Sequence, residues 1–228
     1  MKNKFLMLMI VGLIFPLGGI GVSGISNTYT FNGQPEVESS FTLNSKSDGL
    51  ENGLSVFIYF DALPKGLAIE YNWEFFKVQS LNTTLDYNGL ETKNGEMFSY
   101  RRSHYLTVKK EALGLSIPFL AKAALHLGGG VNQHNSVIPS IALLKDILDE
   151  NDLSDLYEGF NPDDIDTGDF MKALENHSIN ATGLHIQTGV QGKLLMLNAF
   201  INARYTFIID SDDMESFPGL TIGLAYGI

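Results

Sequence analysis

The stretch Leu67-Ala-Ile-Glu-Tyr-Asn-Trp-Glu-Phe75 alternates between large apolar side chains and small or polar ones. Successive side chains of a β-strand point to opposite faces, so this period of two predicts a strand with one apolar and one polar face. The apolar face carries Leu67, Ile69, Tyr71, Trp73 and Phe75, and the polar face carries Ala68, Glu70, Asn72 and Glu74.

The same alternation recurs along the chain. Apolar residues recur at alternate positions in four further segments, at 54–60, 121–127, 182–190 (where the same face also carries Thr182) and 195–207. The segment 105–117 alternates less cleanly, and a register slip near Lys109-Lys110 predicts a β-bulge there. With strands also expected at 36–43 and 217–228, we expect a single domain of about eight antiparallel strands.

The links between these strands differ in length. Short links at 61–66, 118–120 and 192–193 alternate with longer ones at 44–53, 80–103, 133–178 and 209–216. Bacterial transmembrane barrels show this asymmetry, with brief periplasmic turns and longer extracellular loops. The sequence therefore predicts an all-β, up-and-down transmembrane β-barrel. The alternative is a soluble lipocalin-like barrel with its apolar face inward, which periodicity alone does not exclude.

The N-terminus has the order of a secretory signal peptide. Lys2 and Lys4 precede the uncharged apolar run 5–15, which Pro16 and several small residues follow. We expect residues 1–24 to be removed, with the cut after Ser23 or Gly24, and residues 25–228 to form the barrel. A transmembrane anchor is the alternative, but the run is shorter than the roughly 20 residues that span a bilayer.

Composition limits the possible functions. The chain has no cysteine, so disulfides, a thiolate nucleophile and cysteine-ligated zinc are excluded. A net charge of −11 argues against a nucleic-acid partner. Residues 133–178 contain eleven Asp and Glu against Lys145 and Lys172, together with apolar spacing that predicts a helix within 139–151. A second helix is expected after Thr167 or Gly168. This stretch is expected to be a partly helical extracellular loop.

The last strand carries a recognisable C-terminal pattern. Its outward row is apolar, and the other face holds only small residues. The spacing is similar to the signal that barrel-assembly machinery recognises, carried here by Thr221, Gly223, Tyr226 and Ile228. The terminal residue departs from the usual phenylalanine.

The chain resembles the small outer-membrane β-barrel family of Bacteroidetes-type bacteria. The resemblance is carried by Leu113-Gly-Leu-Ser-Ile-Pro-Phe-Leu-Ala-Lys122, by Leu127-Gly-Gly-Gly-Val131 and by the paired segments between Gly183 and Tyr205. It covers about residues 30–228 apart from 133–178. It implies an outer-membrane barrel and carries no catalytic residue.

The polar faces of the strands are expected to line the lumen. An eight-stranded barrel is only wide enough for side chains to fill, so buried charges must pair with one another. We expect a structural plug in which Phe200 and Met196 also face inward; a narrow pore or a small-ligand pocket is the alternative. The predicted lumen set is Glu70, Asn72, Glu74, Lys122, His126, His185, Asn198, Asn202 and Arg204.

Two weaker patterns concern metal binding and catalysis. The acidic stretch with Asp163, Asp164, Asp166 and Asp169 resembles a calcium loop but fails the spacing of an EF-hand, so a solvated loop is expected. His177-Ser178 could be a hydrolytic pair, but adjacent strand residues point to opposite faces. Because no catalytic motif accompanies it, we expect no enzyme and no cofactor.

The interpretation that these patterns favour is an outer-membrane barrel with a structural or surface-interaction role. A porin-like channel or small-ligand transporter is the alternative, and a lipid-modifying enzyme is a third hypothesis. The partners expected are outer-membrane lipid, the barrel-assembly machinery during biogenesis, and an extracellular partner of loop 133–178.

Overall fold

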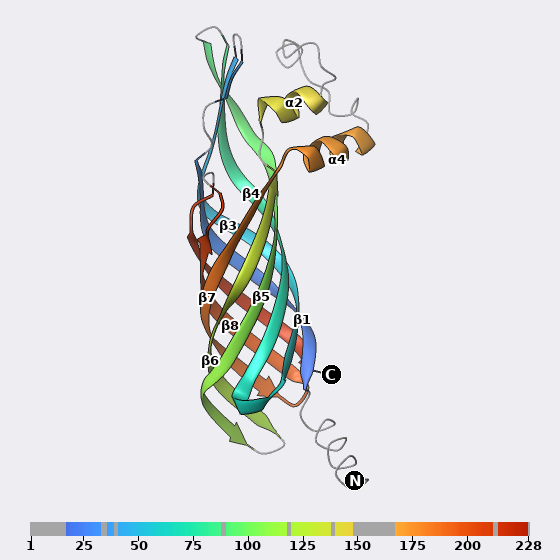
Figure 1. Ribbon diagram of the computed structural model, residues 1–228, viewed down its shortest axis with the longest axis vertical. Coiled ribbons are helices and arrows are strands. Elements are labelled where there is room, and N and C mark those ends of the chain that lie inside the picture. The colour runs from blue at the N-terminus through green and yellow to red at the C-terminus, as the bar shows by residue number, and fades with distance from the viewer. Residues whose placement is uncertain are drawn as a thin grey trace.

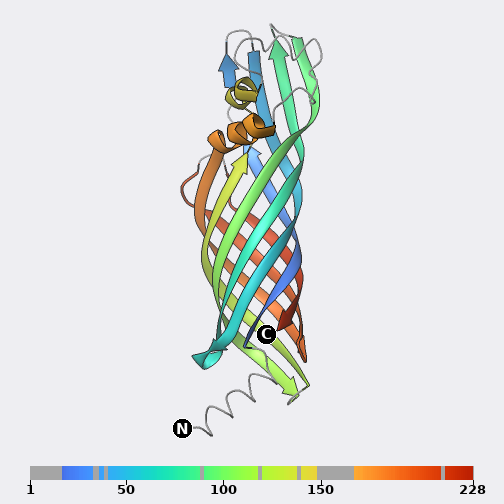
Figure 2. The ribbon, with the colours of Figure 1, turned by 90° about the vertical axis from the view of Figure 1, so that its right-hand side faces the viewer.

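The alternating segments form long antiparallel strands that close on themselves (Figures 1 and 2). The computed structural model describes residues 17–32, 36–38, 41–87, 90–117, 120–137, 140–147, 167–211 and 214–227. Eight of the described strands form the wall: β1 (Gly18–Asn32), β3 (Phe41–Leu63), β4 (Leu67–Tyr87), β5 (Leu90–Ile117), β6 (Ala121–Val137), β7 (Ser178–Leu194), β8 (Leu197–Ile208) and β9 (Phe217–Gly227). The three-residue β2 (Glu36–Glu38) pairs with β3 beyond the wall.

The barrel closes through β1, which pairs with β9 on one side and with β3 on the other. The register fixes the tilt of the strands. The row of paired residues that starts at Leu67 on β4 passes around the whole wall and returns to β4 at Lys77, ten residues further along. For eight strands this stagger corresponds to a tilt of about 40° from the barrel axis.

The two ends of the barrel differ. The 3₁₀ turn η1 (Pro64–Gly66) and the tight turn at Leu195-Met196 lie at the end where β1 begins and β9 ends. At the opposite end lie the two described helices between β6 and β7, α2 (Ile141–Ile147) and α4 (Thr167–Asn176) (Figures 1 and 2). Short turns at one end and a long partly helical connection at the other confirm the predicted up-and-down barrel.

Several boundaries differ from the sequence-based expectation. The segment expected as a link at 44–53 lies inside β3, and most of 80–103 lies inside β4, which ends at Tyr87, and β5, which begins at Leu90. Polar residues continue these strands because strand pairing beyond the wall does not require an apolar face. The bulge lies between Glu111 and Leu113 rather than at Lys109-Lys110. β7 continues to Leu194, so the turn follows 192–193.

The first strand of the wall also differs. The expected strand at 36–43 corresponds to β2 and the beginning of β3, whereas the first wall strand is β1, which starts at Gly18. Its glycines have the small-residue composition of a signal-peptide cleavage region. For that reason the sequence pattern of residues 18–24 indicates a leader and does not predict a strand there. Removal of residues 1–24 would delete Gly18–Gly24, most of the stretch that pairs with β9. A mature barrel that keeps the whole β1–β9 pairing requires any cleavage to lie upstream of Gly18.

Gly21 and Gly24 test whether β1 belongs to the mature wall. A Cβ on Gly21 would lie 2.4 Å from Phe57 Cζ and 2.5 Å from the Leu224 carbonyl oxygen, whereas a Cβ on Gly24 would meet nothing within 4 Å. We expect Gly21→Val to abolish the heat-modifiable folded band on gels and Gly24→Val to retain it.

A cut after Gly24 predicts the opposite pattern. Valine at the residue before the cut would then block processing of Gly24→Val, and Gly21→Val would fold normally. The intact mass of the mature protein provides an independent measurement.

Candidate functional site

The outer wall of the barrel is apolar. Every wall strand exposes large hydrophobic side chains on its outer face, including Val22, Ile58, Ile69, Val108, Leu127, Ile186, Ile201 and Leu224. A closed barrel satisfies its backbone hydrogen bonds within the wall, and such an exterior matches hydrocarbon rather than water. The chain is a transmembrane β-barrel of the outer-membrane type.

The predicted lumen residues lie inside this wall. Seven of the nine are buried, and Lys122 and Asn202 are half-buried. Phe200 also points inward and is buried. Met196 does not: it lies in the β7–β8 turn with 41% of its surface exposed, and it accepts a hydrogen bond from the Tyr226 hydroxyl. The turn lies at residues 195–196. Met196 is therefore part of the turn and does not occupy an inward position on a strand.

Charges inside the described lumen occur in pairs. Lys109 Nζ lies 2.6 Å from Glu70 Oε2, and Arg204 Nη2 donates to both Glu74 oxygens at 2.7 and 2.9 Å. Three more cations pair with carboxylates in the same way: Arg101 with Glu51, Lys122 with Glu111, and Lys193 with Asp61. Because five cations face five carboxylates, these pairs carry no net charge.

Aromatic rings surround the buried cations. The Arg101 guanidinium lies 4.1 Å from the Phe76 ring centre and 4.9 Å from that of Phe217, and the Arg204 guanidinium lies 3.4 Å from the Tyr105 ring centre. Cation–π contact adds to ion pairing where water is excluded. Arg101 is fully buried, so this layer is filled by protein atoms.

Histidines and hydroxyls complete the middle of the lumen. His185 Nε2 lies 2.9 Å from Thr107 Oγ1, and His134 Nδ1 lies 2.7 Å from Ser103 Oγ. Both imidazoles pack edge-on against the Tyr105 ring, at 5.1 and 5.5 Å between centroids. The Asn72 amide donates to Glu70 at 3.0 Å, and Arg101 Nη1 lies 3.5 Å from His134 Nδ1, so neutral groups contact two of the ion pairs.

An aromatic cluster fills the lumen nearer the short turns. Phe57, Tyr59 and Phe200 pack with ring centroids 5.4 to 6.5 Å apart. The Asn198 amide donates to the Tyr59 hydroxyl at 2.6 Å. On the β9 side, a Cβ on Gly223 would lie 2.9 Å from Ser23 Cβ, so even a methyl group would be crowded there.

The sequence reasoning missed most of these ion-pair partners. They fell in segments expected to be links, or beside the expected bulge and turns, and they are Glu51, Asp61, Arg101, Lys109, Glu111 and Lys193. The alternation on β5 could have located two of these residues. Every second residue from Arg101 to Lys109 lies on the inner face of the strand.

The long β6–β7 connection has a small apolar core of its own. Leu143 of α2 packs with Val137 and with Ala173 of α4, and Leu174 lies beside them. His177 Nε2 lies 2.7 Å from Asp146 Oδ2, and the Ser178 hydroxyl donates to the Glu175 carbonyl oxygen. The two residues of the hypothetical hydrolytic pair therefore contact different partners, and the structure does not bring them together as a catalytic unit.

The β8–β9 loop is fastened to β7. The Thr182 hydroxyl donates to Asp210 Oδ2 at 2.6 Å, and the Thr182 amide donates to the other oxygen. These hydrogen bonds lower the pKa of Asp210, so its carboxylate stays charged. The loop is thereby held against β7.

The acidic stretch considered for metal binding lies largely outside the described residues, which include Asp169 but not Asp163, Asp164 or Asp166. In the part of the chain that the structure describes, no three His, Cys, Asp or Glu side chains gather as metal ligands would. No helix among the described residues is long and apolar enough to cross a membrane.

The residues of the C-terminal pattern alternate across the wall. Thr221 and Gly223 face the lumen, and Tyr226 faces outward with 53% of its surface exposed. Ile228 lies outside the described residues. This placement is that of an ordinary wall strand, which β9 completes by pairing with β1.

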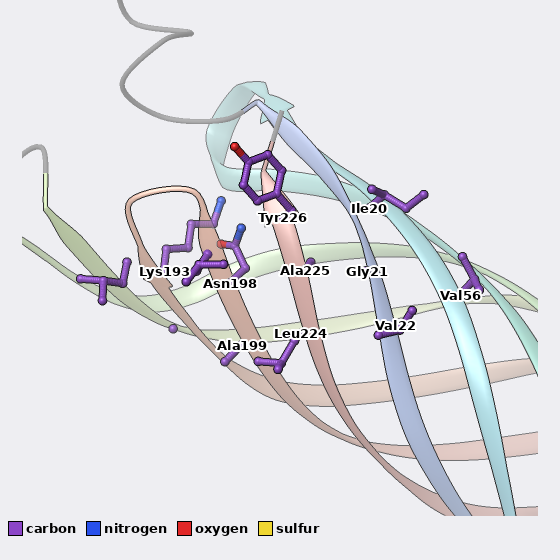
Figure 3. A pocket seen from close by; sticks show the side chains of 13 residues that line it. Ile20, Gly21, Val22, Val56, Lys193, Asn198, Ala199, Leu224, Ala225 and Tyr226 are labelled. Carbon is purple, nitrogen blue, oxygen red and sulfur yellow. The ribbon is translucent and has the colours of Figure 1, made fainter.

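An open depression of about 800 Å³ lies near the short-turn end of the wall (Figure 3). Its aliphatic lining includes Ile20, Val56 and Leu224. The charged residue of the lining, Lys193, pairs with Asp61. Such a lining suits hydrocarbon rather than a polar solute.

The chain is similar to known proteins in fold but not in sequence. No protein-family model matches the chain, and no curated protein matches it. Among solved structures, the attachment invasion locus protein Ail of Yersinia pestis is 8% identical, with 94% of this chain and 100% of that chain covered and a TM-score of 0.42. Neisserial surface protein A is 11% identical (92% and 97% covered, TM-score 0.43). A major outer membrane protein from Thermus thermophilus is 11% identical (92% and 99% covered, TM-score 0.42). At these scores the barrel assignment rests on the strand pairing of this chain itself.

Breaking one lumen ion pair should be more harmful than replacing it. Arg204→Leu leaves Glu74 buried without its partner, so we expect a loss of about 3–5 kcal/mol in the free energy of unfolding. Arg204→Leu with Glu74→Leu should recover most of that loss, because no charge remains unpaired. Urea unfolding in lipid vesicles measures both.

The matched control is Lys110→Leu, which removes a cation from the exposed outer face of β5 and should change stability by less than about 1 kcal/mol. Equal effects of the single and double lumen variants would contradict the paired network.

Proposed function

We propose that this protein is a non-conducting barrel of the cell outer membrane that presents an acidic, partly helical extracellular surface, with a structural or surface-interaction role and no enzymatic activity. The observation that carries the proposal is the filled lumen. Five ion pairs, their aromatic neighbours and the Phe57 cluster occupy successive levels of a tube that is only a side chain wide. Such an interior holds the barrel together and leaves recognition to the loops.

The charge distribution supports a role for the loops. The connections 138–177 and 209–216 contain 15 of the 26 Asp and Glu but two of the 15 Lys and Arg. Their net charge is −13, so the remainder of the chain carries +2. Both connections emerge next to β7, where Asp210 binds Thr182. An extracellular partner with a positively charged surface fits this end of the barrel.

The proposal includes the biogenesis expected from the sequence. A leader directs export, the barrel-assembly machinery recognises the C-terminal pattern at Thr221, Gly223, Tyr226 and Ile228, and the apolar wall meets lipid. It also includes membership of the Bacteroidetes-type outer-membrane barrel family, which rests on the motifs around Leu113–Lys122.

One observation favours the second candidate, a narrow path for ions or small solutes. Ser23 Oγ and both polar side-chain atoms of Asn27 are buried on β1 without hydrogen-bond partners among the described groups. Unpaired polar atoms are costly unless water reaches them. The crowding at Gly219, where a Cβ would lie 2.1 Å from Asn27 Oδ1, argues against a path there.

Conductance in planar bilayers distinguishes the two candidates. We expect the wild-type barrel to give no channel events above the bilayer background. Replacing Glu74, Tyr105 and Arg204 together by alanine removes one level of the plug, and this variant provides the positive control for insertion and detection. Discrete channels from the wild-type protein would overturn the non-conducting assignment.

A loop-neutral variant tests the surface-interaction role. Replacing the acidic residues between 146 and 175 by their amides leaves the wall unchanged, so the heat-modifiable band should persist. We expect binding of fluorescent polylysine to proteoliposomes to fall at least several-fold and to weaken with added salt in the wild type. Unchanged binding by the neutral variant would remove the acidic loop as the interaction surface.

A further inference from the structure

A polar and aromatic cluster interrupts the outer wall just below the long-loop end. It consists of outward residues on three neighbouring strands, here called the β4–β6 rim: Tyr71, Trp73 and Phe75 on β4, Arg102 and His104 on β5, and Asn135 on β6. Arg102 pairs in register with Phe75 on one side and with Asn135 on the other. The lumen network uses none of these side chains.

The aromatic members hold His104 in a defined position. The Tyr71 hydroxyl lies 2.6 Å from His104 Nδ1, and the Trp73 ring stacks on the imidazole with centroids 6.0 Å apart and an interplanar angle of 17°. Phe75 supports Trp73 at 4.7 Å between ring centroids. When the phenol donates to Nδ1, the neutral imidazole carries its own proton on Nε2, which leaves that N–H to donate to a ligand.

The rim also presents a positive charge. Arg102 is exposed on the wall, and among the described side chains no carboxylate pairs with it. A guanidinium is suited to phosphate because its fork of N–H groups matches two phosphate oxygens.

The level of the rim identifies the ligand as part of a lipid. Directly below Arg102 and His104 on β5, the outward residues are Leu106 and Val108, and the next outward charge is Lys110. At about 3.3 Å per residue and a tilt of about 40°, the two cations are separated by about 20 Å along the membrane normal. This is close to the apolar height of outer-membrane barrels, which places Arg102 at headgroup level. Tryptophan and tyrosine favour the same level.

We propose that the β4–β6 rim binds the phosphate of an anionic lipid headgroup in the leaflet at the long-loop side, with Arg102 as the phosphate ligand and His104 as a second donor. The assignment of this leaflet to one side of the outer membrane rests on the orientation given in the proposed function. Binding of the headgroup does not depend on that orientation. Tyr71 and Trp73 fix His104, and the lipid chains lie over Leu106 and Val108.

Trp73 makes the site directly measurable, because it is the single tryptophan of the chain. The full chain is reconstituted in bilayers that contain brominated phosphatidylglycerol or brominated phosphatidylcholine at equal mole fraction, and quenching of Trp73 fluorescence is recorded. One interfacial cation favours an anionic lipid by about 1 kcal/mol, so we expect about a fivefold preference for phosphatidylglycerol. Arg102→Gln should reduce the ratio to near one.

Two variants control for charge and for folding. Lys110→Gln makes the same charge change at the other edge of the wall and should retain the fivefold preference. Arg102→Lys keeps the charge without the fork and should give an intermediate ratio. Each variant must keep the heat-modifiable band, and Arg102→Lys keeps the test decisive if Arg102→Gln does not fold.

The possible outcomes separate the rim from the barrel. Equal quenching by the two lipids in the wild type, or an unchanged preference in Arg102→Gln, would overturn the lipid site while leaving the filled barrel intact. Loss of the preference on adding millimolar inorganic phosphate would show a site for free anions instead of a lipid headgroup. Absence of quenching by both lipids would contradict the membrane barrel itself.

Discussion

The width of the lumen is the constraint on which the rest of the structure depends. Eight strands with a stagger of ten residues enclose a space that side chains fill, so no inward polar group is far from another strand. Charges in such a space must be paired, because an unpaired buried charge costs several kcal/mol. The five ion pairs follow from this requirement. Three of them join strands that are not neighbours in the wall, as Glu74 of β4 and Arg204 of β8 show, and these three cross the lumen.

The same constraint separates the surfaces of the molecule by function. The charges of the interior ion pairs cancel, and the outer wall between the levels of Arg102 and Lys110 is apolar. Neither region therefore contributes to the net charge. The excess of carboxylates is confined to the connections at one end of the barrel. The tube holds these connections in place, and the α2–α4 core and the Asp210–Thr182 contact fix their bases. In the proposed function, recognition, lipid contact and structural support therefore belong to different parts of one small domain.

Closure places a further demand on β1. Its inward positions face bulky side chains of the Phe57 cluster, so the strand that closes the barrel must be narrow there, and Gly19, Gly21 and Ser23 meet that demand. Small residues following an apolar run also characterise the end of a signal peptide. One composition thus satisfies two physical requirements, and only strand pairing distinguishes them. This explains why residues 18–24 read as a leader in the sequence and form a wall strand in the structure.

The sequence by itself determined the strands and their division into an apolar and a polar face, because a strand's period of two is a local property that each segment displays alone. That the apolar face is the outer one follows from the closed wall. The sequence also located the β6–β7 connection and the helix that begins at Thr167. Only the tertiary structure decided which strands close the ring, how far β3, β4 and β5 extend, and which charges pair. Those features depend on register between segments distant in the chain, and no local pattern encodes the partner of Arg101 or Lys109. The β4–β6 rim has the same origin, since Trp73 and His104 become neighbours only when β4 and β5 are in register.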